Sequence, residues 1–238
     1  MSEQHTVIVG GSSGIGLATA RTLLDAGHKV TVTGRSQARL DTAASKLGDR
    51  PQSIVMDAAD PAAAKSAFGT IGTFDHLVLS LGSTKGVGPF ASVDLAQVRQ
   101  GFEEKVFAHF ATAQAALPFL AKGGSITFVS AVTAHAAMPG TAGIGAANAA
   151  VAALVPILAA ELKPLRVNGV SPGIIDTPWW NFLADDAKAS VFADYAAKTP
   201  VGRVGSSDHI AQTIAFLISN GFMTGEVIVC DGGLRFGG

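Results

Sequence analysis

Three glycines near the start of the chain have the spacing of a phosphate-binding turn. They follow the β-branched run at residues 6–9 in the pattern G-x-x-x-G-x-G, and residues 17–26 after them have helical spacing. Glycine lets another group approach the backbone closely, and a helix N-terminus offers free N–H groups to a phosphate. The alternative is an ordinary glycine-rich turn without a ligand. We expect a dinucleotide pyrophosphate here, bound by Gly10, Ser12, Ser13, Gly14, Ile15 and Gly16.

An arginine follows the second predicted strand. An NAD site uses an acidic residue at this place to bind the ribose hydroxyls, whereas this chain reads Thr33-Gly34-Arg35-Ser36. A guanidinium beside a hydroxyl is instead suited to a 2′-phosphate. Arg35 and Ser36 therefore favour NADP(H) over NAD(H), and the alternative is a solvent-exposed arginine at a helix start.

The elements that must position these residues alternate between strand and helix patterns. Apolar runs at 6–9, 29–33, 53–56, 76–79, 125–129, 166–170 and 226–229 predict seven strands. Such alternation is typical of an α/β protein with a parallel sheet covered on both faces. No linker or repeat divides the chain, so we expect a single doubly wound Rossmann domain over residues 1–238.

Two helical segments and one segment without a clean period carry further expectations. Asp94 can cap a long helix that reaches about Leu120 and is stopped by Gly123-Gly124. Residues 142–162 predict a helix with a kink or local distortion at Pro156. Residues 176–205 have no clean period and are expected to form a substrate lid.

The bulk composition excludes several classes of protein. Of the 238 residues, 48 % are hydrophobic and 15 % charged, with a net charge of −1, which argues against nucleic acid as a partner. The single Cys230 excludes an internal disulfide and a cysteine-based zinc site, and no His, Asp and Glu spacing indicates a metal. The reduced cysteine and the lack of a leader pattern favour a cytoplasmic protein.

The apolar stretch at 142–160 is long enough to span a membrane. It is mostly alanine and glycine, contains Pro156 and has no aromatic or basic belt, so a buried or interface helix is the preferred interpretation. The apolar surplus of the whole chain predicts a homodimer or homotetramer.

Four features together resemble the short-chain dehydrogenase/reductase family over essentially the whole length. They are VGGSSGIG at 9–16, the order of elements, RVNGVSPGIIDTP at 166–178 and MTGEVIVCDGG at 223–233. The resemblance implies a bound nicotinamide dinucleotide. Besides the glycine turn, the cofactor contacts it implies fall on Asp57, Ala58, Gly82, Pro172, Gly173, Ile175 and Thr177, with Asp57 at the adenine and the last four on the nicotinamide side.

The catalytic residues that this resemblance would imply are replaced. The family's tyrosine and lysine, in Y-x-x-x-K, fall on Ile144 and Asn148, its serine on Ala131 and its asparagine on Lys105. The chain's one tyrosine, Tyr195, lies in the predicted lid. The usual mechanism is therefore in doubt, although the fold is not.

The family's asparagine position holds Lys105 here, and its lysine position holds Asn148, so the two residue types have exchanged places. We hypothesise that Lys105 binds the nicotinamide ribose with Asn148 completing the contact, and that burial lets Lys105 donate a proton near neutrality. The alternative is a solvent-exposed Lys105, or one paired with Glu103 or Glu104.

Other side chains near the fifth predicted strand could also take part in catalysis. Ser130 and Thr133 could each donate a hydrogen bond to a substrate oxygen, or only satisfy local backbone. His135 could be a general acid or simply solvated. Residues Trp179, Trp180, Phe182 and Phe192 indicate an apolar or aromatic substrate, or only anchor the lid.

Two functions remain open. The first is an NADP(H)-dependent oxidoreductase that acts on a small apolar carbonyl, imine or activated alkene with a non-standard proton donor. The second is an NADP(H)-binding protein without redox activity, such as a sensor, a scaffold subunit, or a lyase or cyclase on the same fold.

Overall fold

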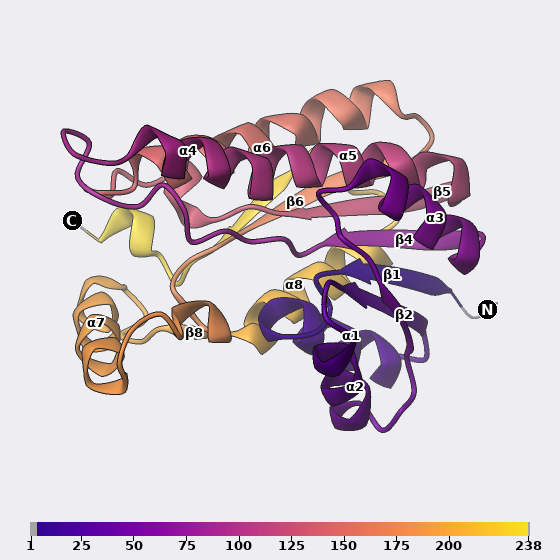
Figure 1. Cartoon of the computed structure of the whole chain (residues 1–238), viewed down its shortest axis with the longest axis horizontal. Helices are drawn as coiled ribbons and strands as arrows, with labels where there is room; N and C mark the ends of the chain where they lie inside the picture. The colour runs from indigo at the N-terminus through magenta and orange to yellow at the C-terminus, as the bar shows by residue number, and fades with distance from the viewer. Residues whose placement is uncertain (1–3, 238) are drawn as a thin grey trace.

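The predicted parallel sheet is confirmed by the computed structural model, which describes residues 4–237 (Figure 1). Its seven strands lie in the order β3-β2-β1-β4-β5-β6-β9, and all neighbours are parallel. They are β1 His5–Val9, β2 Lys29–Gly34, β3 Gln52–Val55, β4 Phe74–Leu79, β5 Leu120–Val129, β6 Arg166–Pro172 and β9 Val227–Cys230. The order reverses between β1 and β4, and open sheets of this kind bind ligands at such a switch point.

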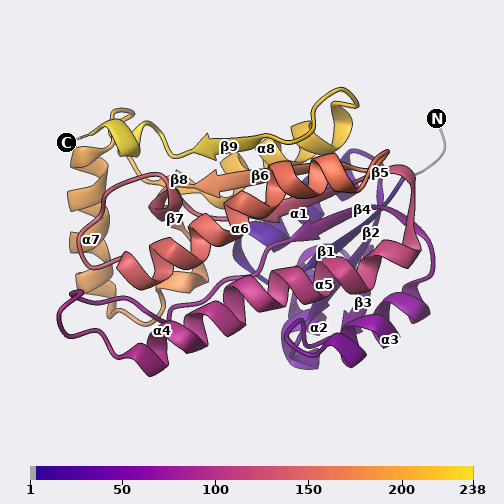
Figure 2. The same cartoon turned by 90° about the horizontal axis from the view of Figure 1, so that it is seen from above.

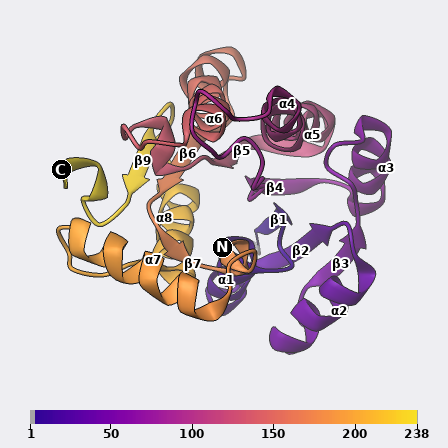
Figure 3. The ribbon, with the colours of Figure 1, turned by 60° about the vertical axis from the view of Figure 1, so that its left-hand side comes forward.

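Helices cover both faces of the sheet (Figures 1 and 3). One face carries α1 Gly14–Asp25, α2 Gln37–Lys46 and α8 Ser207–Ser219. The other carries α3 Pro61–Ile71, α4 Leu95–Phe102, α5 Ala108–Ala116 and α6 Ala142–Glu161, which Figure 2 shows from above. The short strands β7 Ile175–Asp176 and β8 Gly205–Ser206 pair with each other, and α7 Asp185–Lys198 lies between them in sequence.

The strands are apolar because both of their faces are buried. Along β1, Val7 and Val9 face a core cluster with α3, α5 and α6, while Ile8 faces a second cluster with α1, α2 and α8. All three side chains are at most 1 % exposed. Burying a side chain of this size stabilises the fold by about 2 kcal/mol, so the two clusters hold the strand ends in fixed positions.

The long helix predicted from Asp94 runs without a gap to Phe119, with a π-helical turn inside it. It consists of α4, the π-helical turn η1 Glu103–Phe107, α5 and the 3₁₀ turn η2 Leu117–Phe119. The expectation that Gly123-Gly124 stops it is wrong, because both glycines lie inside β5. A Cβ at Gly124 would collide with the Asp75 carbonyl, so glycine is needed there for close strand packing.

Two further segments differ from their sequence patterns. Residues 176–205 contain the helix α7, which has no buried residue and therefore no clear apolar stripe. The helix α6 runs without a break through Pro156, so the predicted distortion is not seen as an interruption. Within residues 4–237, α6 is also the one helix long and apolar enough to cross a membrane by length and composition, but it packs on β5 and β6.

Candidate active site

The glycine turn joins β1 to α1 as the sequence predicts. Gly10 and Gly14 have positive φ angles of 82° and 52°, and a Cβ on Gly16 would collide with the carbonyl of Gly10. Ser13 is the N-cap of α1, but its side chain makes no capping bond, and the first turn has no acidic residue. The N–H groups of Gly14, Ile15 and Gly16 are therefore available to an anion, and the turn fits a pyrophosphate.

The residues predicted for the 2′-phosphate lie beside this turn. A Cβ on Gly34 would stand 3.3 Å from the Ser12 hydroxyl, so the end of β2 contacts the turn directly. Arg35 follows and is exposed, and Ser36 caps α2 by accepting a bond from Arg39 N at 3.4 Å. The Ser36 hydroxyl keeps its own hydrogen for donation, and the guanidinium is accessible.

The remaining cofactor residues lie at neighbouring strand ends. Asp57 follows β3 on the surface, with one carboxylate oxygen 3.0 Å from Ala59 N, and the buried Ala58 accepts a bond from Thr112. Gly82 follows β4 and is exposed. The structure thus places these residues along one edge of the sheet, as expected of parallel strands that all end there.

The Ser-Pro-Gly segment ends β6 and leads to the predicted lid. Pro172 is buried, and Gly173 cannot carry a Cβ because the backbone of Asp231 lies too close. Ile175 is buried in β7, and Thr177 lies 3.4 Å from the position that a Cβ on Gly14 would take. The start of the predicted lid therefore lies beside the glycine turn.

Lys105 is neither solvent-exposed nor paired with an acid. It lies in η1, is 6 % exposed, and its Nζ donates to the carbonyls of Leu81 and Val129, each at 2.8 Å. Those carbonyls belong to the ends of β4 and β5. Burial lowers the pKa of Lys105 to about 7, because the charged form loses its hydration. A protonated amine would keep one N–H hydrogen beyond these two bonds.

Asn148 lies in α6 and is also buried. Its Nδ2 donates to the Thr133 hydroxyl and to the Ile144 carbonyl, both at 3.0 Å, whereas its Oδ1 has no hydrogen-bond partner. A buried amide oxygen without a donor is unfavourable by about 1–3 kcal/mol. No protein group in the described residues supplies a hydrogen bond to this oxygen.

The two hydroxyls near Asn148 differ in availability. Ser130 donates its only hydrogen to the Asn148 carbonyl at 2.8 Å, so it binds α6 to β5 and is not free to act on a substrate. Thr133 accepts from Asn148 and retains its own hydrogen. The predicted substrate role of Ser130 is thus not supported by its contacts, whereas Thr133 remains a candidate donor.

Two histidines near the site have different surroundings. His109, one turn beyond Lys105, is fully buried with its ring nitrogens near the carbonyls of Lys105 and Leu79, at 2.6 and 3.2 Å. Burial lowers its pKa to about 3, and the charge of Lys105 acts in the same direction. His135 has an exposed ring whose Nε2 lies 2.9 Å from the Ser171 hydroxyl.

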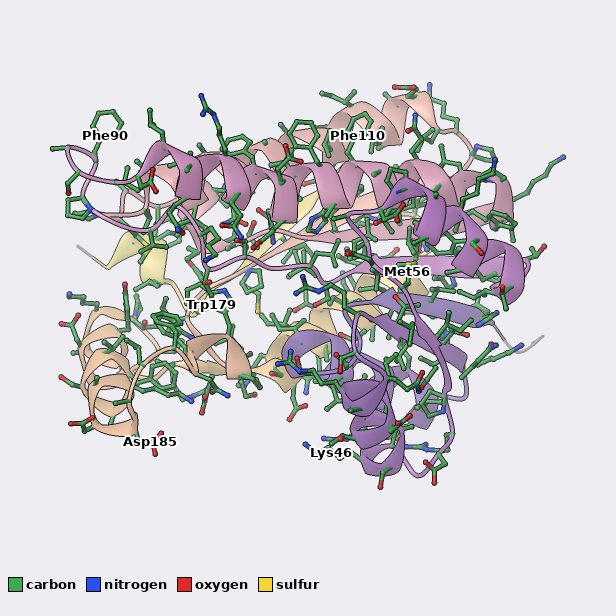
Figure 4. The ribbon with its side chains drawn as sticks, in the orientation of Figure 1. Lys46, Met56, Phe90, Phe110, Trp179 and Asp185 are labelled. Carbon is green, nitrogen blue, oxygen red and sulfur yellow. The ribbon has the colours of Figure 1, made fainter. Side chains whose placement is uncertain are left out.

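The aromatic residues of the predicted lid form one cluster, in which the rings of Trp179 and Trp180 have centroids 4.8 Å apart. Trp180 packs edge-on against Phe192 with a 5.5 Å centroid distance, and its Nε1 donates to Ile175 within the same segment. Trp179 instead donates from Nε1 to the Ser83 carbonyl at 3.0 Å, beyond β4 (Figure 4). No sequence pattern indicates this contact, because the two residues are 96 positions apart.

The cavity nearest to these residues does not include the two buried polar side chains. A cavity of about 420 Å³ lies beside Thr133 and Phe90, but neither Lys105 nor Asn148 lines it. Within residues 4–237, no group of three or more His, Cys, Asp or Glu side chains is arranged to hold a metal ion.

The comparison with known proteins agrees with this geometry. The chain matches the enoyl-(acyl carrier protein) reductase family over residues 9–235. An oxidoreductase of Methylorubrum extorquens is 34 % identical, with 96 % of each chain covered. The cis-4-hydroxycyclohexanecarboxylate dehydrogenase of Sinomonas cyclohexanicum is 31 % identical, over 98 % of this chain and 96 % of that one.

A solved structure is similar over the whole fold. A small-chain dehydrogenase in complex with NADPH has a TM-score of 0.88 and 32 % identity, over 99 % of this chain and 100 % of that one. The fold and the glycine turn define an oxidoreductase of the class that uses a nicotinamide cofactor. Within that class, the chain belongs to the short-chain dehydrogenase/reductase family.

Proposed function

We propose that this protein is an NADP(H)-dependent oxidoreductase that acts on a small apolar carbonyl, imine or activated alkene, with Lys105 as its proton donor. One observation carries the proposal. The amine of Lys105 is buried between the ends of β4 and β5 and is held there by two backbone carbonyls. A lysine held in this way, with its pKa lowered to about 7, has a proton to give at neutral pH.

The preference for NADP(H) rests on charge. Arg35 is exposed beside Ser12 and Ser36, and the residue before it is Gly34 rather than an acid. A guanidinium binds a phosphate through two parallel hydrogen bonds, which no carboxylate at this place opposes. The similar dehydrogenase structure in complex with NADPH supports the same choice.

When bound, the nicotinamide supplies the hydride of the reaction. The protein's own residues bind the cofactor, orient the substrate and supply the proton. The N-terminus of α1 binds the pyrophosphate, and the free Oδ1 of Asn148 accepts a hydrogen bond from a ribose hydroxyl. Lys105 donates its third N–H to that ribose hydroxyl and replaces the proton that this hydroxyl passes to the substrate, and Thr133, oriented by Asn148, donates a hydrogen bond to the substrate.

The proposed substrate class follows from the absence of the family's catalytic tyrosine. Ile144 stands where the family has tyrosine, so no phenol stabilises a developing oxyanion. An imine or a polarised alkene depends less on such a group than a ketone does. The aromatic lid residues, such as Trp179, add an apolar surface near the lid base.

We also propose that the protein is a homo-oligomer. Phe107 and Phe110 are 57 % and 49 % exposed on the α5 side of the molecule, and Ile157 is exposed on α6 (Figure 4). Large apolar side chains gathered on one helical layer are typical of a subunit interface.

Substitution of Lys105 by methionine tests the proposed proton donor. Lys105→Met keeps the length of the side chain and removes the amine. We expect turnover to fall by roughly 10²–10⁴-fold, the usual contribution of a general acid. Turnover is measured with NADPH over a panel of ketones, cyclic imines and enones, and NADPH affinity by fluorescence titration.

Lys46→Met is the matched control, because Lys46 is exposed at the end of α2, far from the strand ends (Figure 4). Equal turnover in both variants would overturn the role of Lys105. Tight NADPH binding by the wild-type chain without hydride transfer to any acceptor would instead favour the non-redox function.

A further inference from the structure

The segment Leu81-Gly82-Ser83, separated from β4 by Ser80, is held from two sides. Lys105 binds the Leu81 carbonyl at 2.8 Å, and Trp179 binds the Ser83 carbonyl at 3.0 Å. The Trp179 ring also covers the glycine between them, since its Cδ1 lies 3.8 Å from where a Cβ on Gly82 would stand. The proposed proton donor and the lid thus share one three-residue segment.

A second hydrogen bond joins this segment to η1, in addition to that of Lys105. The Ser83 hydroxyl donates to the carboxylate of Glu104 at 2.7 Å, and Gln100 donates to the other oxygen of the same carboxylate at 2.7 Å. Glu104 is the neighbour of Lys105 in η1, a π-helical turn of the kind that is frequent at functional sites. The segment is therefore bound to η1 through both Leu81 and Ser83.

The lid side depends on Trp179. Trp180 makes an indole hydrogen bond of the same length, 3.0 Å, but to Ile175 at the base of the lid itself. The two tryptophans therefore make equivalent bonds with different consequences. The bond of Trp180 stays within the lid, whereas that of Trp179 joins the lid to the residues that hold Lys105.

We propose that Trp179 is a positioning residue for the reaction at this site. Its indole N–H fixes Ser83 when the lid is closed, and through Gly82 it fixes the Leu81 carbonyl that holds the amine of Lys105. This inference rests on the proposed role of Lys105. Gly82 has no side chain to restrain its backbone, so the segment depends on outside contacts for its position.

The inference has a consequence for the amine. Without the Trp179 bond, the segment moves and water reaches Nζ, so the pKa of Lys105 rises toward its ordinary value. A merely structural role of Trp179 in the lid would leave this pKa unchanged.

The experiment compares Trp179→Phe with Trp180→Phe in the full chain without cofactor. Each variant loses one indole–carbonyl bond and keeps an aromatic ring. The titration of Lys105 is followed by NMR of lysine labelled with carbon-13 at Cε, and Lys105→Met identifies its signal. We expect Trp179→Phe to raise the midpoint by about one pH unit and Trp180→Phe to leave it in place.

Equal midpoints in the two variants would overturn the inference. If Trp179→Phe does not fold, Trp179 of the Trp180→Phe chain is replaced by benzothienylalanine, which has the same ring shape with sulfur in place of N–H. The same rise is expected, and an unchanged midpoint contradicts the proposal.

This test is separate from that of the proposed function. The titration needs no turnover, so an inactive protein with a shifted midpoint would reject the reaction and keep the coupling between lid and amine. An active protein with equal midpoints would support the reaction and reject the coupling between lid and amine.

Discussion

At the scale of single residues, the burial of Lys105 has an energetic consequence. A pKa of about 7 in the folded chain, against 10.5 when exposed, corresponds to about 5 kcal/mol between the two protonation states. Because the folded value is lower, the unfolded chain holds the proton more tightly, and this contribution opposes folding below pH 7. It is relieved as the pH rises from about 7 to 10.5. Methionine at this position would avoid the cost of burying a charged amine. The presence of a lysine is therefore not explained by stability alone.

Arg35 offers a test of cofactor choice at the same scale. Arg35→Ala removes the guanidinium that we expect to bind the 2′-phosphate. Loss of a charge-assisted hydrogen bond should weaken NADPH binding about 10- to 100-fold and leave NADH binding nearly unchanged. Both dissociation constants are measured by calorimetry.

The control for Arg35 is Arg50→Ala, which removes an exposed arginine that pairs with Asp25 instead. A loss of affinity for NADPH and NADH by equal factors would contradict the assignment, since it would indicate contact with a part that both cofactors share.

The sequence predicts some of these residues and not others, for a physical reason. Lys105 and Asn148 could be found because they occupy positions that a family pattern marks. The pairing of Trp179 with Ser83 could not, because no periodicity links a lid residue to a strand end 96 positions earlier. Ser130 and Thr133 look alike in sequence, and only the contacts of Asn148 distinguish the bound hydroxyl from the available one.

At the scale of elements, two buried histidines predict how stability changes with pH. Burial lowers the pKa of His76 in β4 to about 4 and that of His109 in α5 to about 3. Both folded values lie below the ordinary 6.5, so the unfolded chain takes up protons first as the pH falls. Their stabilising contribution is therefore full above pH 6.5 and is lost progressively below it.

We expect the free energy of unfolding to decrease by about 2–3 kcal/mol between pH 7.5 and 5.5, because each histidine contributes about 1.4 kcal/mol over this whole range. Urea unfolding at several pH values measures it. His76→Asn should reduce the slope by about half. An unaltered slope in His76→Asn would contradict this account.

The elements themselves were largely predictable. The apolar runs predicted all seven sheet strands, and the helix predicted at residues 142–162 agrees with α6 to within one residue at its end. The failures have local causes. The interior glycines of β5 resemble a helix stop, and α7 has no buried face whose spacing could be recognised.

At the scale of the whole molecule, the exposed aromatic side chains predict the assembly. Phe110→Glu places a charge on the outer face of α5 and should reduce a dimer to monomers, or a tetramer to dimers, in sedimentation velocity. Phe222→Glu, at a fully exposed residue before β9, should reduce a tetramer to a dimer, or change nothing in a dimer. A wild-type chain that sediments only as a monomer would refute the proposed oligomer.

The position of the two tryptophans has a practical consequence for the study of this protein. The chain contains two of them, and both lie in the 3₁₀ turn Pro178–Trp180. The ultraviolet emission of the protein therefore originates at the predicted lid. An emission change during denaturation reports that the turn Pro178–Trp180 has detached from the sheet. Circular dichroism, to which every helix contributes, reports the loss of the sheet and its two helical layers. A difference between the two melting curves would measure how independently the lid opens.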